Sequence, residues 1–176
     1  ITRDSDVTLS PTDRTNSILS KFGNSSDVIV ISNHVNAGGG EGAEVIYALR
    51  NNDTLAKNVL NNIGTTGQTT RKYYQRRLPS DTSKDYYFIH RNTGVTEPVI
   101  VEYGFIDNAD DVRFLKDLNK LNEYCENIPD DADIVLFDYI IADQGKGREK
   151  INKMKENNKL LKFAFLFLLE KLKELP

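Results

Sequence analysis

The sequence predicts an α/β domain in which a mostly parallel central sheet is flanked by helices on both faces. Two observations predict this class. Short, uninterrupted apolar runs, typical of strands buried on both faces, alternate with segments of helical spacing. The chain has 176 residues, a length usual for one domain. We therefore expect a single three-layer domain over residues 1–176.

The first half of the chain alternates between the two kinds of element. Residues 13–22 carry apolar side chains at helical spacing and are expected to form a helix that stops at Gly23. The apolar run at 28–31 predicts a strand that ends at residues 32–34. A second strand is expected within 42–49, followed by a helix over 53–63 that stops at Gly64.

The middle of the chain changes in composition. Residues 64–85 are polar and rich in threonine and arginine, so a surface loop or a short helix is expected. The apolar runs at 86–89 and 98–101 then predict two further strands, and the second delivers Glu102 at its C-terminal end. Arg71, Arg76 and Arg77, with neighbouring tyrosines, are interpreted as a solvated loop; the alternative is a groove for an anionic ligand.

The last third of the chain is expected to be helical with one ambiguous segment. A helix is predicted over 110–127, and residues 132–142 suit a buried strand or a helix equally well. Residues 152–175 have the pattern of an amphipathic helix. Their apolar run, 163–169, is far shorter than the ~20 residues of a membrane span, so no membrane span is expected.

Charge and cysteine content exclude several classes of protein. The formal net charge is −3 and the isoelectric point is about 5.5, so no nucleic-acid partner is expected. Cys125 is the single cysteine, which excludes an intrachain disulfide and a cysteine-rich zinc module. No G-x-S-x-G segment is present, which argues against an unrelated serine hydrolase of α/β type.

Two side chains are candidates for chemistry because they follow buried strands. In open α/β sheets, ligands bind near the carboxyl ends of the strands, where His34 and Glu102 are expected. An imidazole there could bind a metal or transfer protons; the alternative is a hydrogen-bonded loop histidine. A carboxylate next to four apolar residues suits a general base, unless a salt bridge holds it. His90 is expected on the surface, with a substrate groove as the alternative.

Several stretches, taken in order, resemble the zinc-dependent N-acetylmuramoyl-L-alanine amidases of bacterial cell-wall turnover. They are residues 32–37 (SNHVNA), 42–45 (GAEV) and 98–108 (PVIVEYGFIDN), preceded by 2–6 (TRDSD). The resemblance runs over roughly residues 1–118, and we take 1–128 as the matching core. It implies a phosphorylase/hydrolase-like sandwich, zinc bound by His34, and catalysis by Glu102.

The same resemblance suggests a circular permutation or a rebuilt C-terminus. Family members begin with a strand, a D-P-G-H-G zinc loop, a glutamate ligand and a first helix, and the sequence lacks these ahead of residue 2. Residues 143–147 (DQGKG) resemble the loop, and Glu156 resembles the ligand glutamate. The hypothesis is that residues 129–176 hold the relocated first strand, zinc loop and first helix.

The metal site predicted by the resemblance departs from the family in one position. Lys146 stands where the first zinc histidine would be, and a protonated amine is not a usual zinc ligand. The predicted zinc ligands are therefore His34 and Glu156. The sequence separation between Lys146 and Glu156 is shorter than the corresponding loop of the family. Glu149 is therefore an alternative to Glu156 as the glutamate ligand.

The function implied by the resemblance is hydrolysis of peptidoglycan. Zinc-activated water would cleave the amide between N-acetylmuramic acid and L-alanine, and Glu102 would act as the base. The expected partner is the muramyl peptide, the expected state a monomer, and the expected location the bacterial cell wall or the extracellular space, with a mother-cell or phage enzyme as variants. The alternative is a non-catalytic or rebuilt amidase scaffold with an incomplete zinc site.

Overall fold

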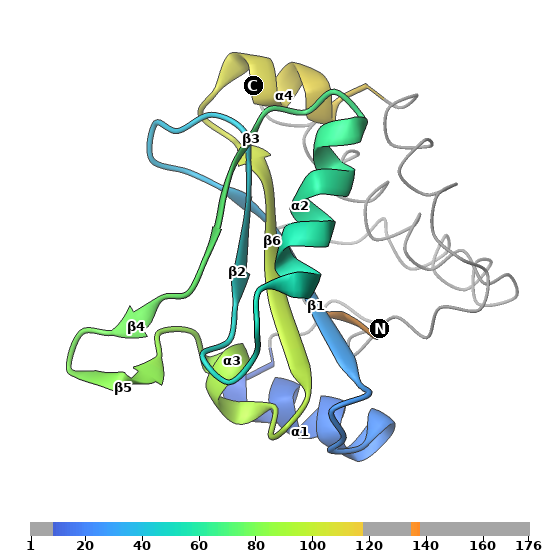
Figure 1. The fold of residues 1–176 in the computed structure, drawn as a ribbon, viewed down its shortest axis with the longest axis vertical. Coiled ribbons are helices and arrows are strands. Elements are labelled where there is room, and N and C mark those ends of the chain that lie inside the picture. Colours follow the sequence, from blue (N-terminus) through green and yellow to red (C-terminus); the bar gives the residue numbers. More distant parts are fainter. Residues whose placement is uncertain (1–8, 118–134, 138–176) are drawn as a thin grey trace, which may run out of the picture.

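The computed structural model describes residues 9–117 and 135–137 and confirms the α/β class (Figure 1). A five-stranded sheet has the order β3-β2-β6-β1-β7. Its neighbouring strands are parallel except for β2 and β6. The strands of the sheet are β1 (Ile29–Asn36), β2 (Ala43–Tyr47), β3 (Thr70–Tyr74), β6 (Glu97–Phe105) and β7 (Val135–Phe137).

Helices cover both faces of the sheet, as predicted. They are α1 (Pro11–Phe22), α2 (Thr54–Thr65), α3 (Phe88–Asn92) and α4 (Ala109–Leu115). On one face, Ile18 of α1 and Ile89 of α3 pack against strand residues such as Val30. On the other face, Leu60 of α2 packs with Val45 and its neighbours in a second apolar cluster. The sheet is therefore buried on both sides, which explains its continuous apolar strands.

The two long helices begin and end for local reasons. Ser10 caps α1 by accepting a hydrogen bond from the backbone N–H of Asp13, and α1 ends at Gly23 with φ of 87°, as predicted. The predicted stop of α2 at Gly64 is wrong, because the helix continues to Thr65. The left-handed residue that follows it is Gly67, with φ of 91°.

Both central strands extend further than the apolar runs predicted. β1 continues through His34 to Asn36, and β6 continues past Glu102 to Phe105. Polar residues at the ends of these strands hid the extension, because the sequence argument relied on apolar composition. His34 and Glu102 therefore lie within ladders of hydrogen-bonded strands and not in loops beyond them.

The predictions for residues 64–89 are largely wrong, whereas the strand predicted at 98–101 lies within β6. Residues 64–85 hold β3 and a small hairpin of β4 (Arg77–Leu78) and β5 (Asp81–Asp85), so the solvated loop is not what the structure shows. β3 is an edge strand, and edge strands carry exposed charges that obscure their pattern. The predicted strand at 86–89 is instead the approach to α3, since a short apolar run does not distinguish strand from helix.

The C-terminal third is described only in part. The helix predicted over 110–127 ends at Leu115 in α4. The ambiguous segment 132–142 contains strand β7, which pairs with β1 in parallel. The predictions for 152–175 and for the apolar run 163–169 lie outside the described residues. Within the described part of the chain, no helix is long and apolar enough to span a membrane.

Candidate functional site

Four ionisable side chains form a row across four neighbouring strands. His34 of β1 pairs in register with Glu102 of β6. Glu102 pairs on its other side with Glu44 of β2, which in turn pairs with Lys72 of β3. The row lies where β1 and β6 approach their C-terminal ends and β2 and β3 begin. Residues paired across strands share a face of the sheet, so His34, Glu102 and Glu44 lie on one side.

That side is the face covered by α1 and α3. Side chains alternate along a strand, so His34 shares its face with Val30, and Glu102 shares its face with Ile100. Val30 and Ile100 belong to the apolar cluster that includes Ile18 of α1. The ionisable row therefore continues an apolar core toward the sheet end, which explains why Glu44 and Glu102 are buried and His34 is partly buried.

Glu102 has the most perturbed carboxylate of the row. The residue is 9% exposed, and its Oε2 atom is buried without a hydrogen-bond partner among the described residues. Burial raises the pKa of Glu102 to about 7, and the nearby Glu44 carboxylate adds to the rise. A carboxyl group that titrates near neutral pH can accept a proton and return it.

The imidazole of His34 is kept neutral by its surroundings. Burial lowers its pKa, and the positive charge of Arg14 on α1 lowers it further. Its Nε2 atom lies 2.9 Å from the hydroxyl oxygen of Ser32 on the same strand. A neutral imidazole is the form that binds metals, so His34 has the protonation state that a metal ligand needs.

Glu44 is a buried carboxylate held from several sides. Its side chain is 4% exposed and its Oε1 atom lies 3.3 Å from Nη1 of Arg71 and 3.8 Å from Nζ of Lys72. Its Oε2 atom accepts hydrogen bonds from the Tyr74 hydroxyl at 3.3 Å and from the Asn36 amide at 3.5 Å. The negative charge of Glu44 is therefore compensated by cations and hydrogen-bond donors. The neighbouring Glu102 has no such compensation among the described residues.

Two aspartates after β6 fix the loop that joins β1 and β2. The carboxylate of Asp107 accepts hydrogen bonds from the backbone N–H groups of Gly38 and Gly39, at 2.9 and 2.8 Å. Buried Asp111 accepts from the backbone N–H of Gly42 at 2.8 Å. The loop is thus attached beside the row, and Gly38, Gly39 and Gly42 all have a positive φ, a conformation that residues with a side chain rarely adopt.

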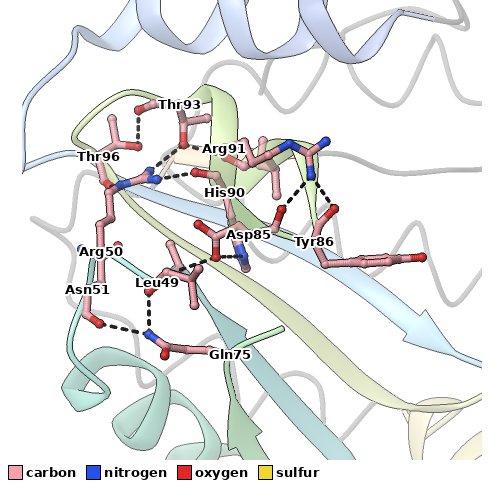
Figure 2. A network of polar contacts seen from close by, with 12 residues as sticks. Leu49, Arg50, Asn51, Gln75, Asp85, Tyr86, His90, Arg91, Thr93 and Thr96 are labelled. Carbon is pink, nitrogen blue, oxygen red and sulfur yellow. Dashed lines mark hydrogen bonds and ion pairs between the residues drawn. The ribbon is translucent and has the colours of Figure 1, made fainter. Parts of the chain in front are cut away.

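The second histidine of the chain belongs to a different cluster, and its predicted place on the surface is wrong. His90 is fully buried at 0% exposure, in the network of polar contacts that Figure 2 shows. Arg50 donates to the backbone carbonyls of His90 and Thr96 and to the Thr93 hydroxyl. Asp85 accepts from the backbone N–H of Leu49 at 2.9 Å.

The ring of His90 is neutral and makes no hydrogen bond within the part of the chain that the structure describes. Burial lowers the pKa of His90 to about 3, and Arg50 contributes to the lowering. Nδ1 lies 3.8 Å from a carboxylate oxygen of Asp85, which is not an ion pair for a neutral ring. Among the described residues neither ring nitrogen has a hydrogen-bond partner. His90 is thus a core residue and does not line a groove.

The structure brings two predicted site residues together and leaves others outside its description. His34 and Glu102 are register neighbours on β1 and β6. Glu156, Glu149, Lys146 and Cys125 lie outside the described residues. The described ranges contain no group of three His, Cys, Asp or Glu side chains that could hold a metal ion. Glu44 was not predicted as a site residue, although a glutamate between the apolar residues of 43–46 is a usable signal.

Comparison with known proteins identifies the family. The sequence model of the N-acetylmuramoyl-L-alanine amidase family matches residues 1–130. A solved structure, Cwp6 from Clostridium difficile, is similar at 30% sequence identity and a TM-score of 0.56, and the match covers 65% of this chain. The chain spans 18% of the length of that protein. No sequence among curated proteins matches the chain. Because the family model covers most of the chain, the protein belongs to the N-acetylmuramoyl-L-alanine amidase family.

Proposed function

We propose that this protein hydrolyses the amide bond between the lactyl group of N-acetylmuramic acid and L-alanine in peptidoglycan. The observation that carries the proposal is the pairing of Glu102, a buried carboxyl group with a pKa of about 7, with the neutral imidazole of His34 on the next strand. Family membership supports the substrate class. On the same grounds, the proposed partner is peptidoglycan and the proposed location is the cell wall or the extracellular space.

The residues present fit part of a zinc site. His34 offers a neutral imidazole, and the unpaired Oε2 atom of Glu102 beside it could accept a proton from a water molecule. A catalytic zinc ion takes three protein ligands and leaves a position for water. We propose His34 as one ligand and Glu156 as another, with Glu149 as the competitor, and both glutamates lie outside the described residues. When bound, zinc would lower the pKa of a water molecule and polarise the substrate carbonyl.

The chemistry of Glu102 follows from its surroundings. Its carboxylate would accept the proton of the attacking water and later donate it to the leaving nitrogen of L-alanine. A pKa near 7 suits both steps, because the group then accepts and releases a proton at similar cost. Glu44 supports this role, since its negative charge contributes to the raised pKa.

The proposed permutation has support from strand pairing. β7, at residues 135–137, lies parallel to β1 on the side away from β6. Val30 pairs with Val135 and Ser32 with Phe137, so a segment from the end of the sequence joins the sheet beside the strand that bears His34. We propose that this segment is the family's first strand, relocated to follow the core in sequence.

The metal content of the purified protein tests the proposal. We expect about one zinc per chain by elemental analysis after dialysis without chelator, and loss of zinc in His34→Ala. His90→Phe is the matched control, because it removes the other buried histidine and should retain zinc. Absence of zinc from the unsubstituted protein would overturn the enzyme proposal and favour an amidase-derived scaffold without a working metal site.

A further inference from the structure

The register between β2 and β3 shifts beside the ionisable row. Ala43 pairs with Thr70, but the next residue, Glu44, pairs with Lys72. Arg71 is therefore the extra residue of a β-bulge, a feature that redirects side chains next to functional sites. Consecutive residues of a regular strand point to opposite faces, yet Arg71 and Lys72 both reach Oε1 of Glu44.

The guanidinium group of Arg71 is fixed on three sides. Besides Glu44, it lies over the ring of Phe105, 5.0 Å from the ring centre. A Cβ atom at Gly40 would lie 2.2 Å from Nη1 of Arg71 and 2.3 Å from the ring of Phe105. The absence of a side chain at position 40 is thus what allows the arginine to occupy this place. The backbone of Phe105 is held because its N–H donates to Asp111.

Arg71 keeps hydrogen-bonding capacity that Glu44 does not use. A guanidinium has five N–H donors in one plane, and the contact with Glu44 engages Nη1. Within the described residues, Nε and Nη2 of Arg71 have no hydrogen-bond partner, and the side chain is 37% exposed. A rigid, partly exposed guanidinium with free donors is suited to bidentate recognition of a carboxylate.

The distance between Arg71 and Glu102 corresponds to two or three residues of an extended peptide whose scissile amide lies at Glu102. β3 lies two strands away from β6, so the backbones of Arg71 and Glu102 are roughly 10 Å apart at ~4.8 Å per strand. An extended peptide covers ~3.3–3.6 Å per residue. The second or third residue after the scissile amide would therefore come near Arg71.

We propose that Arg71, held against Glu44 and Phe105 by the bulge in β3, binds a carboxylate of the substrate's peptide stem. This assignment rests on the function proposed above and adds a specificity-determining residue to it. Lys72 also contacts Glu44, so compensation of the Glu44 charge alone does not require a fixed, stacked guanidinium at position 71.

Calorimetric binding of two probes tests the assignment. The probes are N-acetylmuramoyl-L-alanyl-D-glutamate and the same compound with its α-carboxylate converted to a carboxamide, and Glu102→Gln is the parent protein so that neither is consumed. We expect the parent to bind the carboxylate probe about 10- to 100-fold more tightly, as for a charged hydrogen bond. Adding Arg71→Ala should remove this preference without changing the affinity for the carboxamide, which also shows that the variant is folded.

Two further variants sharpen the test. Gly40→Ala should displace the guanidinium and reduce the preference although Arg71 is still present. Arg77→Ala, which removes the same charge from an exposed arginine bonded to the Thr82 carbonyl, should leave the preference unchanged. A preference that survives Arg71→Ala, or equal or undetectable binding of both probes by the parent, would overturn the assignment.

The outcomes also separate this assignment from the proposed function. Cleavage of the carboxylate probe is measured with the unsubstituted protein. If that protein does not cleave it but the Arg71-dependent preference is present, the proposed function fails and carboxylate binding stands. If cleavage occurs without the preference, the proposed function stands and the role of Arg71 is wrong.

Discussion

The two histidines of the chain, His34 partly buried and His90 fully buried, have different surroundings. His34 lies in a row of ionisable side chains beside Glu102, whose buried Oε2 atom has no hydrogen-bond partner in residues 9–117 and 135–137. His90 lies in a network where Arg50 and Asp85 are already bonded to backbone groups. Burial lowers the pKa of both rings. A lowered histidine pKa therefore does not identify a functional site. The distinguishing feature is a neighbouring group, such as Glu102, that can still accept and release a proton.

The difference also separates function from stability. In the His90 network each charged side chain fixes a segment of backbone, and Figure 2 shows these contacts joining the residues after β2 to α3. In the row, the buried Oε2 atom of Glu102 has no hydrogen bond from any described residue, and burial disfavours the charged form of its carboxyl group. We expect substitutions in the row to affect catalysis and substitutions in the network to affect folding.

The largest expected effect is on catalysis by the row. Glu102→Gln keeps the shape of the side chain but removes the proton acceptor, so kcat should fall by about 10²- to 10⁴-fold. Zinc content and thermal stability should be retained. Steady-state hydrolysis of a muramoyl peptide measures the change, and a variant with more than half of the original kcat would show that Glu102 is not the base.

The network should give the largest effect on stability. Arg50→Ala leaves two backbone carbonyls and the Thr93 hydroxyl without their donor, so the free energy of unfolding should fall by about 3 to 4 kcal/mol. Urea denaturation of the metal-free protein gives this value. A loss below 1 kcal/mol would mean that water replaces the arginine without cost.

Glu102 of the row and His90 of the network should make stability depend on pH in opposite directions. The pKa of Glu102 is raised from 4.5 to about 7, so its contribution to stability is present below pH 4.5 and is lost as pH rises to about 7, by about 3 kcal/mol. The pKa of His90 is lowered from 6.5 to about 3, so its contribution is present above pH 6.5 and is lost as pH falls.

Single substitutions isolate these two contributions. In metal-free Glu102→Gln the fall due to Glu102 should be absent, so stability should rise from pH 3 to 6.5 through the two histidines, whose pKa values are both lowered. In His90→Phe the fall due to Glu102 should become steeper. Unfolding free energies from pH 3 to 8 measure both, and identical pH profiles for the two variants would contradict the assignment.

The smallest effect is expected for His90→Phe near neutral pH. The ring nitrogens of His90 have no partner among the described residues, so an apolar ring of similar size should leave stability unchanged or raise it by about 1 kcal/mol. Activity should be unaffected. A marked destabilisation in urea would show that the 3.8 Å contact between His90 and Asp85 stabilises the fold.

Elements with a strong local signal were predictable from the sequence. The helix that ends at Gly23 has both a cap and a stop, and the runs 28–31 and 98–101 are apolar enough to require burial between helices. The edge strand β3 was missed because its first residues are exposed and charged, which hides the alternation of a strand. The apolar run at 86–89 contained no signal that would separate a strand from the start of α3.

The sequence motifs predicted individual residues of the candidate site but not how those residues pair across the sheet. His34 and Glu102 were found because each follows a buried run, but the pairing of both Glu44 and His34 with Glu102 depends on strand order. The burial of His90 depends on Arg50, 40 residues earlier in the chain. The place of Arg71 depends on a register shift that no local pattern signals.

Identification of the bond that is cleaved tests the central claim most directly. The unsubstituted protein would be incubated with N-acetylmuramoyl-L-alanyl-D-glutamate and zinc, and the products analysed by mass spectrometry, beside Glu102→Gln and His90→Phe. The account predicts free N-acetylmuramic acid and the dipeptide L-alanyl-D-glutamate from the unsubstituted protein and His90→Phe, and neither from Glu102→Gln. Intact substrate in every sample, or cleavage that persists in Glu102→Gln, would contradict it.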